Sequence, residues 1–353
     1  MNLKSLRRQI DSLDKKIVRL LNARAKLGLR IGNLKRRKGM GAYSPDRETE
    51  VLAKVRSLNK GPLSRLALEA IYREVMSSSL AIDKAPRIAY LGPEATFTQL
   101  AAIKRFGSQV EYIPCNSITD VFTEVEKGVA DYGVVPIENS IEGAVSHTLD
   151  MFVDSDLKIC AQVILYVSHN LLANCPKSEI RRVYSNPQVF GQCRIWLQEN
   201  LPAAEKIDVF STTQAAQIAG RERGGACIAS LLAAKAYNLK IVAKDIEDSP
   251  HNITRFLVIG KSDVKPTGTD RTSVIFSIKD KVGALQDMLL PFKKYRINLT
   301  KIESRPSKKK AWDYYFFVDL QGHKDSPKVK KALAELENKC RFLKVLGSYP
   351  IGE

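Results

Sequence analysis

Three cationic side chains lie on or beside the apolar face of the first predicted helix: Arg7, Arg24 and Lys35. Apolar residues recur from Leu3 to Leu34 at alternating spacings of three and four, a helical seam of heptad type, and Arg24 replaces one of them. A lone arginine in a seam usually packs its stem along the apolar surface and extends its guanidinium to water, whereas a buried guanidinium needs an anion. Because several cations are placed to converge and a guanidinium binds a carboxylate with two hydrogen bonds, the pattern predicts a site for a small dianion.

The segment that must position these groups, residues 1–84, is predicted to be all-helical. Its first helix runs to Lys38 and is about 50 Å long at 1.5 Å per residue. A second helix begins at Pro45, with Ser44 as its predicted cap. A helix as long as the first cannot bury its seam against two short helices, so the sequence predicts an intertwined helical dimer. Further polar residues fall at inward-facing helical positions, and they are Arg47, Glu48, Ser79 and Asp83.

Short β-rich runs alternate with helical runs from Arg87 to about Lys265, which is α/β patterning with strands suited to a mostly parallel sheet. Two lobes of this kind can hold a ligand in the cleft between them, at the carboxyl ends of the strands. After the linker "KPTGTD", the chain is predicted as β-α-β-β-α-β, the order of the ferredoxin-like split motif. We therefore expect three domains, over residues 1–84, 86–265 and 270–353.

Composition limits the class of protein. At 353 residues the chain is too long for one core, and its apolar fraction of 44% favours globular packing. No apolar run approaches the roughly 20 residues of a membrane span, and the charged first residues lack a signal-peptide core. The six cysteines form no CxxC pair and are predicted to be reduced thiols of a cytoplasmic protein. The four histidines are scattered, so we expect no metal and no cofactor.

The net charge of +18 is compatible with a nucleic-acid partner, an acidic substrate or a solvated basic surface, and most of the excess lies before residue 85. Nucleic-acid binders spread Lys and Arg over an exposed face, whereas Arg24 lies in the seam and no helix-turn-helix pattern is present. This favours the acidic substrate and predicts neither a nucleic-acid nor a membrane partner. A ligand-sensing regulator is the alternative class.

The helical segment resembles the all-helical chorismate mutases, because "LRRQIDSLDKKIVRLLNARAKLGLRIGNLK", "PDRETEVL" and "SSSLAID" fall where that family has its three helical motifs. The resemblance implies that Arg7 and Arg24, one from each subunit, bind the carboxylates of chorismate. It also implies that Lys35 and the residue at position 83 contact the ether oxygen, and that Glu48 holds the ring hydroxyl. The rearrangement to prephenate is unimolecular, so the protein need only hold a compact conformer and stabilise charge on the ether oxygen. The other implied substrate-binding residues are Ser44, Arg47 and Ser79.

Two positions depart from the mutase pattern. Ser44 stands where the family often has an aspartate, and Asp83 stands where Gln or Glu is usual. An anionic Asp83 would oppose the developing negative charge, so mutase activity is predicted to rise toward acidic pH if Asp83 must be a donor. A rate that is flat from about pH 5 to 8, or unchanged in Asp83→Ala, contradicts this prediction. A dehydratase with a weak or inactive mutase domain is therefore a second alternative.

The middle segment resembles prephenate dehydratase through five motifs in order: "GPEATFT", "PIENSIEGAVSHTLD", "YSNPQVFGQC", "ACIAS" and "DSPHNITRF". The resemblance implies a two-lobed, periplasmic-binding-protein-like fold and Thr254 as the catalytic donor. Prephenate loses carbon dioxide and its ring hydroxyl together, so a donor beside the hydroxyl assists its departure as water. Threonine is a poor acid in water, and its effect requires a dry, preorganised cleft. The implied pocket residues are Asn139, Ser185 and Gln192, with Thr96, Ser140 and Arg255 close by; His251 is expected to be a surface or capping residue.

The C-terminal segment resembles an ACT regulatory domain, because "GALQ" (283–286) and "ESRP" (303–306) match the two motifs that bind phenylalanine in dehydratases of this type. Gln286 replaces the usual apolar residue. ACT domains bind ligand at paired interfaces, which again implies a dimer. The implied effector-binding residues are Gly283, Ala284, Leu285, Glu303, Ser304, Arg305 and Pro306.

The combined prediction is a cytoplasmic multidomain enzyme, a homodimer or higher homo-oligomer, that takes chorismate to prephenate and then to phenylpyruvate in phenylalanine biosynthesis. L-Phenylalanine is expected to inhibit the dehydratase, and deletion of the residues after about 268 is expected to abolish that inhibition.

Overall fold

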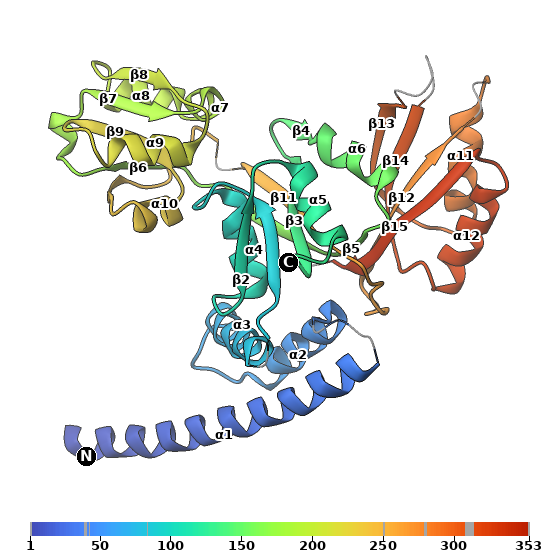
Figure 1. Ribbon diagram of the computed structural model, residues 1–353, viewed down its shortest axis with the longest axis horizontal. Coiled ribbons are helices and arrows are strands. Elements are labelled where there is room, and N and C mark those ends of the chain that lie inside the picture. The colour runs from blue at the N-terminus through green and yellow to red at the C-terminus, as the bar shows by residue number, and fades with distance from the viewer. Residues whose placement is uncertain are drawn as a thin grey trace. The chain divides into compact units, whose positions relative to one another are not determined.

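The computed structural model describes residues 2–38, 41, 43–82, 84–249, 251–278, 281–307 and 314–351 (Figure 1). They form two compact units. The first comprises Met1–Arg87 together with Arg105–Glu111, and the second comprises Ile88–Lys104 and Tyr112–Glu353. In the described part of the chain, no helix is both long and apolar enough to span a membrane.

The first unit contains three helices, α1 (Leu3–Arg37), α2 (Pro45–Leu58) and α3 (Arg65–Ala81). The Asn2 side chain caps α1 by accepting a hydrogen bond from the backbone N–H of Ser5, and three basic residues in the last turn suit the negative end of the helix dipole. Ser44 occupies the N-cap position of α2 as predicted, but it makes no side-chain capping bond. The Ser44 hydroxyl oxygen instead accepts a hydrogen bond from the Lys35 ammonium group, which takes the place of a backbone N–H of α2.

Helix α1 leaves its apolar seam uncovered. It is 35 residues long and contains no buried residue. Leu13, Leu20 and Leu27 are each more than half exposed, at 55%, 68% and 59%. An apolar stripe of this length is characteristic of a helix that packs against another chain.

The first lobe of the second unit is built on a sheet in the order β2-β1-β3-β11-β5, with the two-residue strand β4 paired to β3. Three helices accompany this sheet, α4 (Phe97–Phe106), α5 (Ile118–Glu126) and α6 (Ser146–Asp154). The strands are β1 (Arg87–Leu91), β2 (Glu111–Cys115), β3 (Tyr132–Asn139), β4 (Gly143–Ala144), β5 (Lys158–Tyr166) and β11 (Ile253–Gly260).

The second lobe has the sheet order β10-β6-β9-β7-β8. Its strands are β6 (Asn170–Ala173), β7 (Arg182–Ser185), β8 (Glu205–Asp208), β9 (Gly225–Ala229) and β10 (Lys240–Ala243). Its helices are the 3₁₀ turn η1 (Lys177–Glu179), α7 (Pro187–Gln192), α8 (Arg194–Asn200), α9 (Thr212–Ala219) and α10 (Leu231–Ala236).

The prediction of mostly parallel sheets was wrong, because both sheets are mixed. Strands β1 and β3 are parallel, as are β7 and its neighbours β8 and β9. Strand β11, however, runs antiparallel to both β3 and β5. The cause is the chain path: β5 leads out of the first lobe, the second lobe follows, and β11 returns to insert between β5 and β3. The predicted two-lobed arrangement is confirmed.

The C-terminal part has the predicted β-α-β-β-α-β order and forms an antiparallel sheet in the order β13-β14-β12-β15. Helices α11 and α12 pack together on one face of this sheet (Figure 1). The elements are β12 (Asp270–Ser277), α11 (Ala284–Lys294), β13 (Leu299–Pro306), β14 (Tyr314–Gln321), α12 (Pro327–Glu337) and β15 (Phe342–Pro350).

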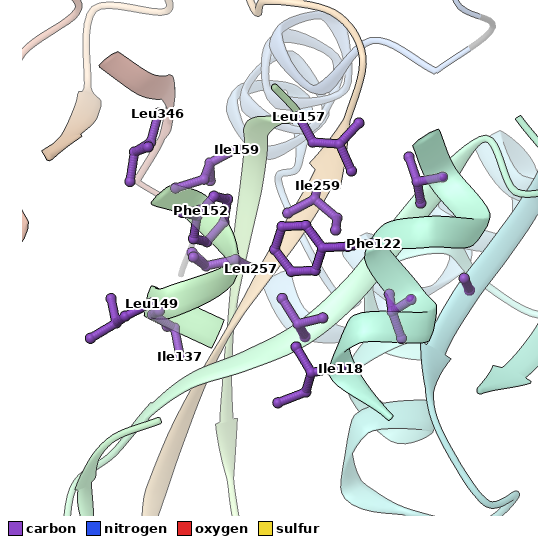
Figure 2. Packing of buried hydrophobic residues seen from close by; sticks show 14 of the residues in the cluster. Ile118, Phe122, Ile137, Leu149, Phe152, Leu157, Ile159, Leu257, Ile259 and Leu346 are labelled. Atoms are coloured by element: carbon purple, nitrogen blue, oxygen red, sulfur yellow. The ribbon is translucent and has the colours of Figure 1, made fainter. Parts of the chain in front are cut away.

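The other face of the C-terminal sheet shares a core with the first lobe. Phe122, Phe152 and Leu257 of the lobe belong to the same buried cluster as Phe317 of β14 and Leu346 of β15, and Figure 2 shows Leu346 beside Phe152. Strands β5 and β15 approach closely, since a Cβ atom at Gly347 would lie 2.3 Å from the carbonyl oxygen of Ile159. The first lobe and the C-terminal domain are therefore one packed body.

Candidate active sites and effector site

Thr254 and Asn139 face each other across strands β11 and β3 and form the centre of the α/β site. The Asn139 amide Nδ2 donates to the Thr254 hydroxyl over 2.8 Å and also to Asn252 Oδ1 over 2.8 Å. The Asn139 oxygen accepts from the backbone N–H groups of Ile141 and Glu142. Because the Thr254 oxygen already accepts a hydrogen bond, its own proton is directed to another acceptor. Thr254 is thus held as a donor, and only 9% of it is exposed.

A chain of polar side chains leads from this pair to the second lobe. Asn252 donates to Gln192 Oε1 over 2.9 Å, and His169 Nε2 donates to the same oxygen over 2.7 Å. Burial lowers the pKa of His169, and the hydrogen bond to Gln192 opposes this shift only in part. His169 is therefore neutral near pH 7 and carries its proton on Nε2.

A cavity of about 380 Å³ lies beside this chain, a volume within the range of small-molecule sites. Both lobes contribute to its lining, which also includes the returning segment before β11. Its acidic groups accept hydrogen bonds from neighbouring N–H groups: Glu247 from His169, Asp248 from Ile195 and Trp196, and Glu142 from Gln188. The lining residues are Ile141, Glu142, Gln188, Gly191, Gln192, Glu247, Asp248, Ser249 and Asn252.

The remaining predicted residues of this site make structural contacts in the described structure. The Ser140 hydroxyl ties β3 to the start of β11 by bonding the Ile253 N–H and the carbonyl of His251, whose side chain is exposed as expected. Ser185 is buried and donates to the Ile228 carbonyl. Thr96 donates to the Leu91 carbonyl and accepts from the Gln99 N–H near the start of α4.

Arg255 follows Thr254 on β11, and its guanidinium is directed to the C-terminal domain. It donates to Asp319 over 2.6 Å, to the Tyr349 hydroxyl over 2.7 Å and to Gln162 over 3.0 Å. Successive side chains of a strand point to opposite faces, so Arg255 and Thr254 diverge. The structure therefore brings Thr254, Asn139 and Gln192 together but does not place Arg255 with them.

Sequence reasoning missed Asn252 and His169. Asn252 lies two residues before Thr254 within "DSPHNITRF", so strand alternation could have placed it on the same face. His169, in contrast, reaches Gln192 only through the pairing of distant segments. Within the described part of the chain, no group of three or more His, Cys, Asp or Glu side chains is arranged to hold a metal ion.

In the helical unit, four of the predicted mutase residues form two hydrogen-bonded pairs. Arg24 donates to the Ser79 hydroxyl over 2.8 Å, between α1 and α3. Lys35 contacts the Ser44 hydroxyl at the start of α2. Arg7 is exposed on α1, about 25 Å from Arg24 at 1.5 Å per residue, so the two cannot share a site within one chain.

Glu48 belongs to a buried cluster with Tyr43 and Arg105. Its carboxylate accepts from the Tyr43 hydroxyl over 2.9 Å and lies 2.9 Å from Nη2 of Arg105. Burial raises the pKa of Tyr43 well above its usual value. Arg47, by contrast, forms an exposed ion pair with Glu50 over 2.7 Å. Asp83 lies outside the described residues.

The two predicted effector motifs lie on different elements of the C-terminal domain. Gly283 is the N-cap of α11 with φ at +76°, a left-handed conformation that favours glycine; Ala284 is buried, and Leu285 is 37% exposed. Strand β13, an edge of the sheet, alternates half-buried Glu303 and Arg305 with exposed Ser304 and Pro306. Arg305 contacts Asp150 of α6 over 3.3 Å.

Comparison with family models divides the chain into three matches. Chorismate mutase type II matches residues 6–84, prephenate dehydratase matches residues 88–264, and the ACT domain matches residues 272–338. These matches cover the three helices, the two lobes and the C-terminal domain as far as the end of α12.

Whole-chain relatives are similar from end to end. A bifunctional chorismate mutase/prephenate dehydratase of Aquifex aeolicus (strain VF5) is 52% identical over 353 residues, which covers 99% of this chain and 98% of that protein. A protein of the same name from Pseudomonas aeruginosa is 45% identical over 355 residues, covering 99% and 97%.

A solved structure is similar over the second unit. The prephenate dehydratase of Arthrobacter aurescens in complex with L-Phe has a TM-score of 0.70 and 32% identity, and the match covers 75% of this chain and 90% of that one. The chain therefore belongs to the bifunctional chorismate mutase/prephenate dehydratase family and is an enzyme with an isomerase domain and a lyase domain.

Proposed function

We propose that the chain converts chorismate to prephenate in its helical domain and prephenate to phenylpyruvate between the two α/β lobes, and that L-phenylalanine inhibits the second reaction. The observation that carries the dehydratase proposal is the Thr254–Asn139 pair beside a small-molecule cavity. End-to-end similarity to relatives named for both activities supports the combination.

For the dehydratase, Thr254 donates a hydrogen bond to the ring hydroxyl of prephenate. The C–O bond breaks as carbon dioxide leaves, and with one proton the hydroxyl departs as water. Asn139 holds Thr254 in the donating orientation. The Asn139 side chain is itself fixed, because its oxygen accepts hydrogen bonds from the backbone N–H groups of Ile141 and Glu142. Neutral groups suffice because formation of the aromatic ring supplies the driving force, and a preorganised donor in a buried site needs no reorganisation.

For the mutase, Arg24 and Lys35 provide positive charge at two points along α1. Ser44, where relatives often have an aspartate, contacts Lys35 as a neutral acceptor. In this proposal, the Lys35 ammonium group faces the ether oxygen of chorismate and stabilises the negative charge that develops there. Ser79 orients Arg24 by accepting its hydrogen bond.

A homodimer completes the mutase site in this proposal. Arg7 and Arg24 are too far apart to act in one chain, and the uncovered seam of α1 offers the surface for a second copy. A two-fold pairing of α1 with its counterpart brings Arg7 of one subunit toward Arg24 of the other.

We place the protein in the cytoplasm, as the sequence predicts. All six cysteines are free thiols in the structure, the state expected in a reducing compartment.

One experiment separates the candidate functions: incubation of the purified chain with chorismate, following prephenate and phenylpyruvate separately, with and without L-phenylalanine. The proposal predicts transient prephenate, accumulating phenylpyruvate and suppression of phenylpyruvate alone by L-phenylalanine. Turnover of added prephenate without turnover of chorismate indicates an inactive mutase. No turnover of either compound indicates a ligand-sensing protein.

A further inference from the structure

Strands β3 and β11 carry two adjacent cross-strand pairs that face opposite ways. Thr254 lies opposite Asn139, and the next residue, Arg255, lies opposite Glu138. The first pair is directed to the active-site network, and the second to the ACT sheet. The register of β11 against β3 shifts directly after Arg255, which marks a β-bulge, a feature that re-aims side chains beside active sites.

The ACT domain supplies two partners of the Arg255 guanidinium, and the first lobe supplies Gln162 and, at 3.8 Å, Glu138. Asp319 of β14 and Tyr349 of β15 each accept from it, and the Ser273 hydroxyl of β12 bonds both of these partners. Arg255 is 8% exposed. A guanidinium in such surroundings must keep its anion, because an unpaired buried charge is strongly unfavourable.

Glu138 makes a second connection to the same domain. Its carboxylate lies 3.0 Å from the ammonium group of Lys301 on β13. Lys301 lies opposite Asp319 in the β13–β14 pairing, so both cross-domain contacts meet at one point of the ACT sheet. Lys301 and Arg305 share the half-buried face of β13, and Arg305 contacts Asp150 of the first lobe.

Strand β13 therefore carries the predicted effector motif, residues 303–306, and also the contacts to the dehydratase lobe. A displacement of β13 or β14 shifts Lys301 and Asp319, and these hold Glu138 and Arg255. Glu138 directly precedes Asn139 in the sequence, and Arg255 directly follows Thr254. The path from the effector motif to the catalytic donor thus has two branches. Each branch is an ion pair followed by one peptide bond, along β3 to Asn139 or along β11 to Thr254.

We propose that Arg255 is a positioning residue that couples the ACT domain to Thr254, so that occupation of the effector site changes dehydratase turnover through the Arg255–Asp319–Tyr349 cluster. This inference rests on the proposed dehydratase activity and its inhibition by L-phenylalanine. It assigns Arg255 a role different from the substrate contact that its motif implies, and it makes the ACT domain part of the support of the catalytic strand.

The test uses the full-length enzyme with Asp319→Asn and Tyr349→Phe, both of which preserve side-chain size. The matched controls are Glu335→Gln and Tyr295→Phe, which break a similar acid–tyrosine contact between the ACT helices, away from β11. Five quantities are measured: dehydratase kcat, dehydratase KM, mutase kcat as an internal measure of folding, L-phenylalanine affinity by calorimetry, and the maximal inhibition by saturating L-phenylalanine.

Both cluster variants are expected to lower dehydratase kcat and the maximal inhibition by at least about fivefold, with KM, mutase kcat and L-phenylalanine affinity close to wild type. The controls are expected to match wild type. Wild-type kcat and inhibition in both cluster variants overturn the coupling role, and so does a loss of inhibition that merely follows a loss of L-phenylalanine binding. Failure of the wild-type enzyme to consume prephenate or bind L-phenylalanine instead overturns the proposed function.

Discussion

At the scale of single residues, the network around Thr254 in the proposed dehydratase site consists of neutral donors and acceptors, and three carboxylates line the cavity beside it. Asn139 is bonded at both ends of its side chain, so the orientation of Thr254 follows from the backbone of the β3–β4 turn. His169 and Asn252 share one acceptor, the Gln192 oxygen. We therefore propose that catalysis depends on the geometry of this neutral network.

Replacement of Thr254 by alanine removes the proposed hydrogen-bond donor to the leaving hydroxyl. We expect Thr254→Ala to lower dehydratase kcat by at least about a hundredfold, in line with the contribution of general acid–base groups, and to leave mutase kcat unchanged. Thr254→Ser, which keeps the hydroxyl, serves as the matched variant and is expected to retain most activity. Steady-state assays with prephenate and chorismate provide the measurement, and a near-normal kcat in Thr254→Ala rules this role out.

The protonation state of His169 predicts a pH dependence of stability. Burial holds the folded-state pKa of His169 below its unfolded value, so the unfolded chain binds the extra proton first. The contribution of neutral His169 to the free energy of unfolding is present in full above about pH 6.5. It is lost as the pH falls through the folded-state pKa.

We expect the thermal midpoint of the wild type to fall between about pH 7 and pH 5.5, and His169→Gln to reduce this dependence. His251→Gln, at an exposed histidine, is the control and should follow the wild type. If the thermal midpoint falls equally with pH in the wild type and in His169→Gln, His169 is not the source of the pH dependence.

At the scale of elements, the ACT sheet contributes to the core of the first lobe. Ile275, Phe317, Leu346 and Tyr349 are buried in the same cluster as lobe residues. Deletion of the residues after 268, which the sequence suggests as a test of regulation, would therefore uncover apolar surface and leave Arg255 without its main anion. Point substitutions are the sharper test of the effector site.

Gly283 offers such a substitution. Its φ of +76° disfavours alanine by about 1–2 kcal/mol, while an added Cβ meets no atom within 4 Å. We expect Gly283→Ala to raise the L-phenylalanine concentration for half-inhibition severalfold without changing uninhibited kcat. Gly268→Ala introduces comparable strain at φ +91° in the linker, also in open space, and should leave inhibition unchanged. Equal responses of the two variants would exclude an effector role for Gly283.

At the scale of the whole molecule, the uncovered seam of α1 and the separation of Arg7 and Arg24 lead to the proposal that two copies of the chain build each mutase site. In the C-terminal domain, strand β13 lies at an edge of the sheet, and an edge strand is a surface through which two ACT domains can pair. In this proposal the mutase reaction depends on assembly of two chains.

Subunit mixing tests this arrangement directly. Arg7→Ala and Arg24→Ala are each expected to abolish most mutase activity as pure proteins. In a heterodimer, one site receives both intact arginines and the other receives neither, so mixing after reversible dissociation should restore about a quarter of wild-type mutase activity. Dehydratase activity serves as the control and should stay constant. No recovery in demonstrated heterodimers would contradict a site that combines Arg7 of one subunit with Arg24 of the other.

The sequence by itself determined what depends on local pattern. Periodicity and turn residues predicted the long α1, the two α/β lobes and the β-α-β-β-α-β order, and the motif around Thr254 indicated the residue now found beside Asn139. The interruption of the seam at Arg24 predicted a carboxylate-binding residue; in the structure Arg24 bonds Ser79, and its role toward substrate stays a prediction.

Only the tertiary structure decided the features that depend on pairing between distant segments. The direction of Arg255 follows from the register of β11 and from the ACT strands beside it, and the antiparallel course of β11 follows from its return through the second lobe. The His169–Gln192 contact and the Arg105–Glu48 ion pair likewise join residues far apart in the chain. Local pattern specifies which face a side chain occupies on its own element, but the partner on that face is set by long-range packing.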